Sequence, residues 1–177
     1  MIIETKRLTI RSLITDDESS FIEMASDGSL NDVGFSNDCS GCMADWILEA
    51  KKLTDADNPT LKYLAYAIEL KEKNILIGSV GCLYYDDLQE VGITYFIGSN
   101  YRHKGYAVEA VKAYVIYFLN HYNICKLIAT VREDNISSWK VVEKVGFELI
   151  EKKIYKDLND EKAEMYHFYE IKNQEAN

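Results

Sequence analysis

Two hydrophobic periods run along this chain, one of two residues and one of about 3.6, and they predict alternating strands and helices. Strands are predicted at residues 7–13, 61–70, 75–85, 90–98, 125–131, 147–155 and 163–171. Helices are predicted at 15–26, from the Gly-containing loop near Cys39 to just before Asn58, at 104–121 and at 137–145. The expected order is βαα, βββ, αβ, αββ.

The spacing of these elements predicts how the strands pair. The polar separators 71–74 and 86–89 are short enough for hairpins, so the three central strands should form an antiparallel meander. The helix at 104–121 connects two strands as a crossover, which places those strands parallel. We therefore expect a mixed α/β fold with a mostly antiparallel sheet, flanking helices and one parallel crossover.

Two of the predicted helices show which face should be buried. In the helix at 104–121 the apolar residues are Ala107, Val111, Tyr114, Val115, Phe118 and Leu119. In the helix that follows Cys39 the face consists of Met43, Ile47, Leu48 and Lys51.

Length and charge narrow the class of protein. The chain has 177 residues, enough for one domain with a sizeable core, which we place at residues 1–172 with a flexible tail at 173–177. Charges within the first seven residues argue against a signal peptide, and no uncharged stretch approaches the length that spans a bilayer. A net charge of −9 disfavours a nucleic-acid partner. We expect a cytoplasmic monomer or homodimer without a membrane partner.

The four cysteines include one CxxC pair, Cys39 and Cys42. A zinc site would need a second pair or histidines at ligand spacing, which this sequence does not supply. We expect no metal and reduced thiols. Metal binding or redox activity at this pair is the alternative.

The segment before the long helix concentrates positive charge where a helix dipole is already positive. Arg102, His103 and Lys104 stand together there, and Gly105 follows them. Each misplaced cation costs about 0.3–1 kcal/mol at an exposed site, so the segment favours an anionic ligand. The exposed N–H groups of residues 104–107 could surround a phosphate. The alternative is a strand-to-helix turn with solvated cations.

Two longer stretches extend this pattern, "EVGITYFIGSNYRHKGYAVEAVKAY" and, about 30 residues later, "VREDNISSWKVVEKVGFE". With their RxxGxA and NxxS motifs they resemble the GNAT N-acetyltransferases of the RimJ/RimL-like branch, and the resemblance extends from residue 7 through the closing strands. It implies the GNAT fold, with its mixed, mostly antiparallel sheet and the parallel crossover at the cofactor site. The chain departs from the branch at "GSN", where an Asp-Pro turn is usual.

The resemblance implies a set of cofactor-binding residues for acetyl-CoA. The pyrophosphate would be held by Arg102, His103, Lys104, Gly105, Tyr106 and Ala107, and the pantetheine arm would pair with the backbone of Tyr95, Phe96 and Ile97. Asn135 would lie near the pantetheine, and Ser138 near the thioester sulfur as the acid that protonates the thiolate. Without the resemblance, Asn135 and Ser137 are good helix caps. Relatives that use a tyrosine acid carry it where this chain has Val142.

The implied reaction is acetyl transfer to a primary amine by direct attack in a ternary complex. Glu90 resembles the family's base and could accept the amine proton through water, although a carboxylate at a strand end is usually just solvated. Trp46 is a candidate substrate contact, and Trp139 a weaker one. The acceptor is an amine-bearing small molecule or a protein N-terminus. The alternative function is a non-catalytic CoA-binding or sensing module with the same fold.

Overall fold

The computed structural model describes residues 1–36, 38–158 and 160–173, so the tail expected at 173–177 lies outside the described residues from 174 on. The strands are β1 (Ile2–Glu4), β2 (Leu8–Ser12), β3 (Tyr63–Leu70), β4 (Ile75–Tyr85), β5 (Glu90–Ile97), β6 (Lys126–Arg132), β7 (Glu148–Tyr155) and β8 (Glu164–Lys172). The α-helices are α1 (Glu18–Ala25), α2 (Met43–Ala56), α3 (Tyr106–His121) and α4 (Ile136–Val145). Short 3-10 turns are η1 (Thr15–Asp17), η2 (Asn31–Val33) and η3 (Ser99–Tyr101).

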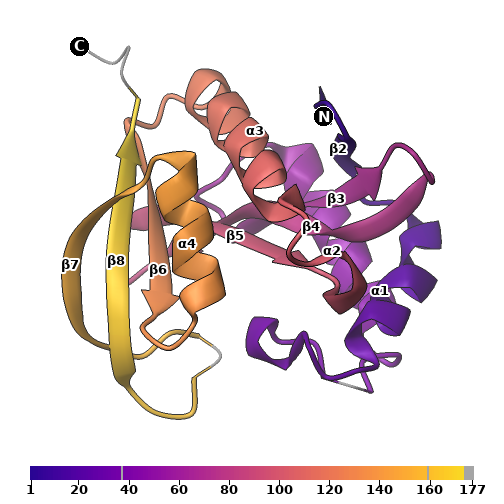
Figure 1. The fold of residues 1–177 in the computed structure, drawn as a ribbon. Coiled ribbons are helices and arrows are strands. Elements are labelled where there is room, and N and C mark those ends of the chain that lie inside the picture. Colours follow the sequence, from indigo (N-terminus) through magenta and orange to yellow (C-terminus); the bar gives the residue numbers. More distant parts are fainter. Residues whose placement is uncertain (37, 159, 174–177) are drawn as a thin grey trace.

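All of these strands form one sheet in the order β1-β2-β3-β4-β5-β6-β8-β7. The pairs β3/β4 and β4/β5 are antiparallel, as the short polar separators predict. β5 and β6 are parallel, and α3 is the crossover between them (Figure 1). The expected mixed, mostly antiparallel sheet with one parallel crossover is confirmed.

β3 shows why the sheet is covered on both faces. Its alternate residues Leu64, Tyr66 and Ile68 belong to the core cluster beneath α3 and α4, whereas Ala65 and Ala67 belong to the cluster beneath α1 and α2. Side chains of a strand alternate between faces, so both halves of this pattern are buried. The continuous apolar run of this segment follows from that position.

The helices differ from the sequence predictions at their ends and on one face. α1 starts at Glu18, because residues 15–17 form a 3-10 turn. α2 buries Met43, Ile47 and Ala50. The predicted face was right for Met43 and Ile47 but wrong for Leu48, which is 49% exposed.

α3 begins at Tyr106 instead of Lys104, because Gly105 has a left-handed backbone (φ +78°) and caps the helix. Its buried residues are Ala110, Val111, Tyr114, Val115 and Phe118, with Ala107 and Leu119 half-buried at the margins of that face. Among the described residues, no helix is both long and apolar enough to cross a membrane.

β1 is an element that the periodicity did not predict. It is a three-residue edge strand that pairs antiparallel with β2, and Ile3 lies opposite Ile10. Three residues are too few to display a period of two, so only the pairing with β2 reveals this strand.

Candidate active site

The sheet opens between β5 and β6. The two strands pair only at Gly92 and Ile128, and in the described part of the chain nothing pairs with this edge of β5 beyond that point. The ring of Tyr85 lies over Gly92, where a Cβ would come within 2.5 Å of it. The opening adjoins a cavity of about 460 Å³. Backbone groups of β5 are thus left available to a ligand that enters between the strands.

The loop after β5 carries the predicted phosphate site. Within the described residues, none of the N–H groups of Lys104, Gly105, Tyr106 and Ala107 donates to a protein acceptor. Gly105 is the N-cap and has no side chain to satisfy these groups. Unpartnered N–H groups together with the helix dipole make an anion-binding site.

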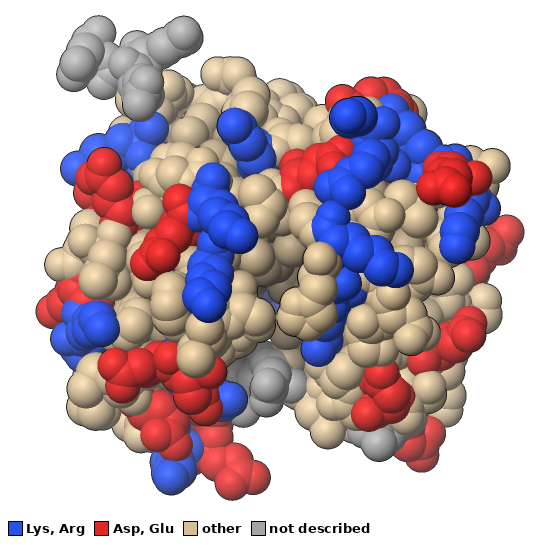
Figure 2. Space-filling view, in the orientation of Figure 1, with Lys and Arg blue, Asp and Glu red and all other residues tan. Residues whose placement is uncertain are grey.

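The surface around this loop is rich in cations despite the net charge of −9. Figure 2 shows Lys and Arg side chains over α4 and over the segment that leads into α3, on either side of a hollow. Arg102, His103, Lys104, Lys140 and Lys144 are all exposed. An anionic ligand in the hollow would have positive charge on both sides.

Arg102 does more than the sequence predicts. Its Nε donates to the carbonyl of Ile97 at 2.9 Å, and one terminal nitrogen donates to the carbonyl of Ser29 at 2.9 Å. The side chain therefore ties the end of β5 to the segment after α1. Lys104 Nζ donates to the carbonyl of Asn100 at 3.0 Å, so both side chains brace this loop.

Arg7 is a further cation at the loop, and the sequence did not reveal it. Its guanidinium lies 4.5 Å from the centre of the Tyr106 ring and donates to the carbonyl of Lys104 at 2.9 Å. Glu109 holds it in place with an Nε–Oε2 distance of 2.6 Å. Arg7 and Glu109 are 102 residues apart, so no local motif could reveal the pair.

Asn135 and Ser138 lie at the start of α4, on the far side of the opening. Asn135 is the N-cap, and its Oδ1 accepts from Ser138 N at 3.1 Å and from the Ser137 hydroxyl at 3.0 Å. Asn135 is therefore a helix cap, one of the two alternatives that the sequence left open. The cap fixes the position of Ser138, which lines the cavity.

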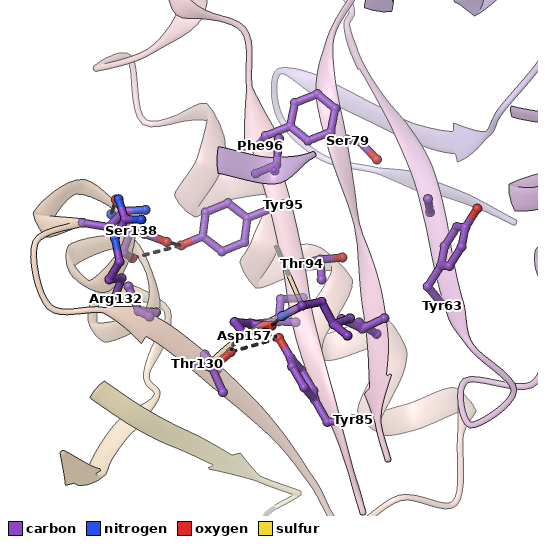
Figure 3. Close-up of a pocket in the computed structure, with 18 of the residues that line it drawn as sticks. Tyr63, Ser79, Tyr85, Thr94, Tyr95, Phe96, Thr130, Arg132, Ser138 and Asp157 are labelled. Carbon is purple, nitrogen blue, oxygen red and sulfur yellow. Dashed lines mark hydrogen bonds between the residues drawn. The ribbon is translucent and has the colours of Figure 1, made fainter. Parts of the chain in front are cut away.

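Ser138 is hydrogen-bonded to a tyrosine from β5. Tyr95 Oη donates to the Ser138 carbonyl at 2.9 Å and lies 2.7 Å from Ser138 Oγ (Figure 3). The single phenolic proton points to the carbonyl, so the serine hydroxyl donates to Tyr95. Burial raises the pKa of the Tyr95 phenol to about 12, which keeps it protonated at neutral pH. A tyrosine hydroxyl is thus present, although not from the helix position where Val142 stands.

The remaining cofactor-binding candidates have different surroundings. Phe96 lines the cavity, whereas Ile97 is buried in the core cluster beneath α3. The predicted pairing of their backbone with pantetheine stays a prediction.

Glu90 lies apart from these groups. It starts β5 and its carboxylate is 2.7 Å from Lys126 Nζ in an ion pair. It does not line the cavity formed by the described residues. Its predicted role as a base stays a prediction, and the ion pair agrees better with a structural role.

The two tryptophans occupy different places. Trp46 lines the cavity and packs edge-on against Phe21 and Phe35, with ring centres 5.3 and 5.0 Å apart. Trp139 is half-buried against the core cluster beneath α3 and α4 and does not line the cavity. Of these two residues, Trp46 is the one that lines the cavity, and its predicted contact with a substrate stays a prediction.

A carboxylate that the sequence reasoning missed lies inside the cavity. Asp157, in the connection after β7, accepts from Thr130 Oγ1 at 3.1 Å and from Tyr85 Oη at 3.3 Å (Figure 3). Its other oxygen accepts from Leu158 N at 2.7 Å. Burial raises the pKa of this carboxyl. The three hydrogen bonds act in the opposite direction, but the pKa stays above its ordinary value.

We expect Asp157→Asn to stabilise the protein at neutral pH. The raised pKa means that the folded state binds the Asp157 proton more tightly than the unfolded state does. The contribution of the Asp157 carboxyl to folding stability is therefore largest at a pH below its pKa in the unfolded state. It is lost as the pH rises through its pKa in the folded state. Thermal unfolding of both proteins between pH 4 and pH 8 should give a Tm difference that grows with pH.

Exposed Asp86 provides the control, because Asp86→Asn should leave the pH dependence of Tm unchanged. A Tm for Asp157→Asn below wild type at pH 8 would contradict the expectation. The titratable groups that face Asp157 are Tyr85, Tyr155, Asp160 and Tyr166. Asn keeps a hydrogen-bonding amide among them.

The cysteines are free in the structure. Cys39 is buried and Cys42 exposed, and Cys42 Sγ donates to the Cys39 carbonyl at 3.3 Å. Burial raises the pKa of the Cys39 thiol. Within the described ranges no group of three His, Cys, Asp or Glu side chains could hold a metal ion.

Comparisons with known proteins place this arrangement in a family. The family model for the acetyltransferase (GNAT) domain matches residues 7–148. An uncharacterised N-acetyltransferase of Bacillus subtilis (strain 168), YnaD, is 32% identical over 81 residues, 46% of this chain and 48% of that protein. The chain thus spans about half the length of the curated relatives it matches.

Solved structures share the whole fold. A GNAT-family acetyltransferase from Bacillus anthracis superposes with a TM-score of 0.78 at 22% identity and covers 97% of this chain and 98% of its own. RimL, a ribosomal L7/L12 α-N-protein acetyltransferase in complex with coenzyme A, gives a TM-score of 0.80 at 13% identity, with 97% and 98% covered. Because the family model covers most of the sequence and the topology agrees, the chain belongs to the GNAT acetyltransferase family.

Proposed function

We propose that this protein is a cytoplasmic acetyltransferase that moves the acetyl group of acetyl-CoA to a primary amine, as the RimJ/RimL-like resemblance implies. The observation that carries the proposal is the set of unpartnered N–H groups at residues 104–107, in the connection from β5, which borders the opening in the sheet, to α3. A diphosphate fits such a site, because backbone donors and cations surround it.

The residues present fit acetyl-CoA along the opening. The loop at 102–107 would hold the pyrophosphate, with Arg102 and Lys104 bracing it. The edge of β5 at Tyr95, Phe96 and Ile97 would pair with the pantetheine amides, although the Ile97 carbonyl already accepts from Arg102. When bound, acetyl-CoA supplies an activated acetyl group on a thiol leaving group with a pKa near 8.5 if it resembles a cysteine thiol.

Ser138 is the proposed proton donor. As the carbon–sulfur bond breaks, its hydroxyl would give a proton to the departing thiolate, and the proton that the attacking amine loses would restore it through water. Tyr95 Oη, 2.7 Å away, holds the hydroxyl in place. The Tyr95 phenol stays protonated at neutral pH, so it supports the serine as a neutral hydrogen-bond partner. The Asn135 cap keeps the serine at the mouth of the opening.

Direct attack by the amine agrees with the lack of an activated nucleophile. Among the described residues, no cysteine lines the cavity. Burial raises the pKa of Cys82 to about 12, so its thiolate is scarce at neutral pH. The attacking amine must lose a proton to water or to a carboxylate. Asp157 lines the cavity and Glu90 does not, so Asp157 is the better placed of the two carboxylates.

The alternative is a non-catalytic CoA-binding or sensing module. Such a module would keep the loop at 102–107 and have no use for the Tyr95–Ser138 contact inside the cavity. Calorimetry with coenzyme A and thiol release from acetyl-CoA with a panel of amines separate the two. Turnover with any amine supports the enzyme, tight binding without turnover supports the module, and a failure to bind contradicts both.

We expect Ser138→Ala to lower kcat by about tenfold to a hundredfold, at the lower end of acid catalysis because the leaving thiol is already acidic. Tyr95→Phe should lower kcat less, since it removes the hydrogen bond that positions the serine and keeps the donor. Both variants should bind coenzyme A like wild type in calorimetry. Ser137→Ala, which changes the adjacent exposed serine, is the control. Unchanged kcat in Ser138→Ala would remove the serine from the mechanism.

A further inference from the structure

The cavity has two chemically different walls. One is apolar and is formed by Val33, Phe35, Trp46, Tyr63 and Phe96. Phe35 packs edge-on against Trp46 and Phe96, with ring centres 5.0 and 5.7 Å apart. The Tyr63 hydroxyl donates to Glu49, which does not line this cavity, so this wall presents mainly carbon.

The other wall carries the two carboxylates of the cavity, Asp157 and Asp160. Asp160 accepts from Tyr166 Oη at 2.7 Å and from Asp157 N at 3.0 Å. Asp157 accepts only from hydroxyl and backbone groups. In the part of the chain that the structure describes, neither forms an ion pair. Half-buried carboxylates without a cation are costly unless a ligand supplies the charge.

The two walls face one space. Figure 3 shows Asp157 beside Thr130 and Tyr85, with Tyr63 on the other side of the cavity. The contact between Tyr95 and Ser138 borders the cavity on a third side. A ligand in this space therefore meets a negative group, an apolar surface and the proposed proton donor together.

From this arrangement we propose that the acceptor is a primary amine with an apolar, preferably aromatic, group next to it. Its ammonium binds Asp157, and its apolar group packs against the wall that contains Phe35 and Trp46. The inference rests on the proposed function and names the substrate class of the same site. An acceptor with a carboxylate beside the amine is disfavoured, because Asp157 and Asp160 would repel it. Arg132 also lines the cavity, but its guanidinium is held by Asp134, with an Nε–Oδ1 distance of 2.6 Å. A diamine can place its second charge near Asp160, yet it leaves the apolar wall uncovered, so an aromatic amine should bind more tightly.

Direct binding tests the substrate class separately from turnover. Phenethylamine, ethylamine, phenylalanine and putrescine are titrated into isotope-labelled protein without acetyl-CoA and followed by NMR. Phenethylamine should bind about tenfold or more tightly than ethylamine, because its ring leaves water, and more tightly than phenylalanine or putrescine. Equal affinities, or a preference for phenylalanine or putrescine, would overturn the proposal even if thiol release from acetyl-CoA proceeds.

Variants test each wall with matched controls. Asp157→Asn should weaken phenethylamine and ethylamine by about tenfold or more, since a charged contact is lost, whereas exposed Asp86→Asn should not. Val33→Ser should weaken only phenethylamine, whereas Leu48→Ser, on the outer side of α2, should not. Val33 is 38% exposed, so its replacement leaves the core intact. Wild-type affinity in Asp157→Asn would overturn the proposal.

A peptide amide with an N-terminal phenylalanine identifies the source of the amine. It offers the same ammonium and ring without a carboxylate beside the amine. Tighter binding of this peptide than of phenethylamine indicates a protein N-terminus, and weaker binding indicates a free amine. Either result satisfies the proposal, provided that Asp157→Asn weakens the tighter ligand.

Discussion

Gly81→Ala should destabilise the protein by about 3 kcal/mol or more, the largest effect we expect from one added methyl group. Gly81 lies in the middle of β4, opposite Ala65 of β3. A Cβ at this position would overlap the backbone carbonyl oxygen of Leu64 and come within 2.7 Å of its carbonyl carbon. Backbone atoms cannot rotate away as a side chain can, so the two strands would have to separate.

Denaturant unfolding measures this loss, with Gly41→Ala as the control. A Cβ at Gly41 meets nothing within 4 Å, so that variant should stay within about 0.5 kcal/mol of wild type. A Gly81→Ala protein with wild-type stability would mean that β3 and β4 do not approach as closely as the structure shows. Since Leu64 and Ala65 also line the cavity, separation of the strands should lower acetyl transfer as well.

Gly105→Val should weaken coenzyme A binding by about 1,000-fold. Gly105 has φ +78°, a conformation that a β-branched residue avoids, and a Cβ there would lie 3.4 Å from Arg7 Nη2. Relaxation to negative φ would turn the N–H groups of the loop away from the phosphate site. The loss of two charged hydrogen bonds at about 1.5–3 kcal/mol each corresponds to this fold-change.

Calorimetry with coenzyme A measures the affinity, and Gly146→Val is the matched control. Gly146 also has positive φ, +113°, but it ends α4 outside the phosphate loop. Both variants should lose about 1–2 kcal/mol of folding stability from backbone strain. Only Gly105→Val should lose coenzyme A. Equal affinities in the two variants would show that the loop does not hold the phosphates.

Local patterns predicted most of the fold, since the strands from β2 onward and the helices each show their own periodicity, whereas β1 does not. The errors fall where neighbours decide the outcome. Leu48 looks apolar enough for the core, yet Ala50 takes the buried position because α2 lies close to β3. Gly105 could be read as the first turn of a helix, but its left-handed backbone makes it the cap.

Asp157 and Tyr95 show why the site was harder to predict than the fold. In sequence, Asp157 is one acidic residue in a polar turn, and it becomes distinctive only beside Thr130 and Tyr85 in a cavity. Tyr95 was expected to contribute its backbone, whereas its hydroxyl meets Ser138, 43 residues further along the chain. Glu90 was chosen by family likeness, and its pairing with Lys126 is invisible in the sequence.

The sequence by itself determined the order of strands and helices from β2 onward, the crossover after β5 and the loop at 102–107 that we propose binds an anion. These depend on hydrophobic period, glycine and charge within a few residues of one another. The tertiary structure alone decided which carboxylate enters the cavity, which hydroxyl supports Ser138 and how the apolar wall faces Asp157. Such contacts join residues tens of positions apart, and they form only when burial of both faces of the sheet brings those segments together.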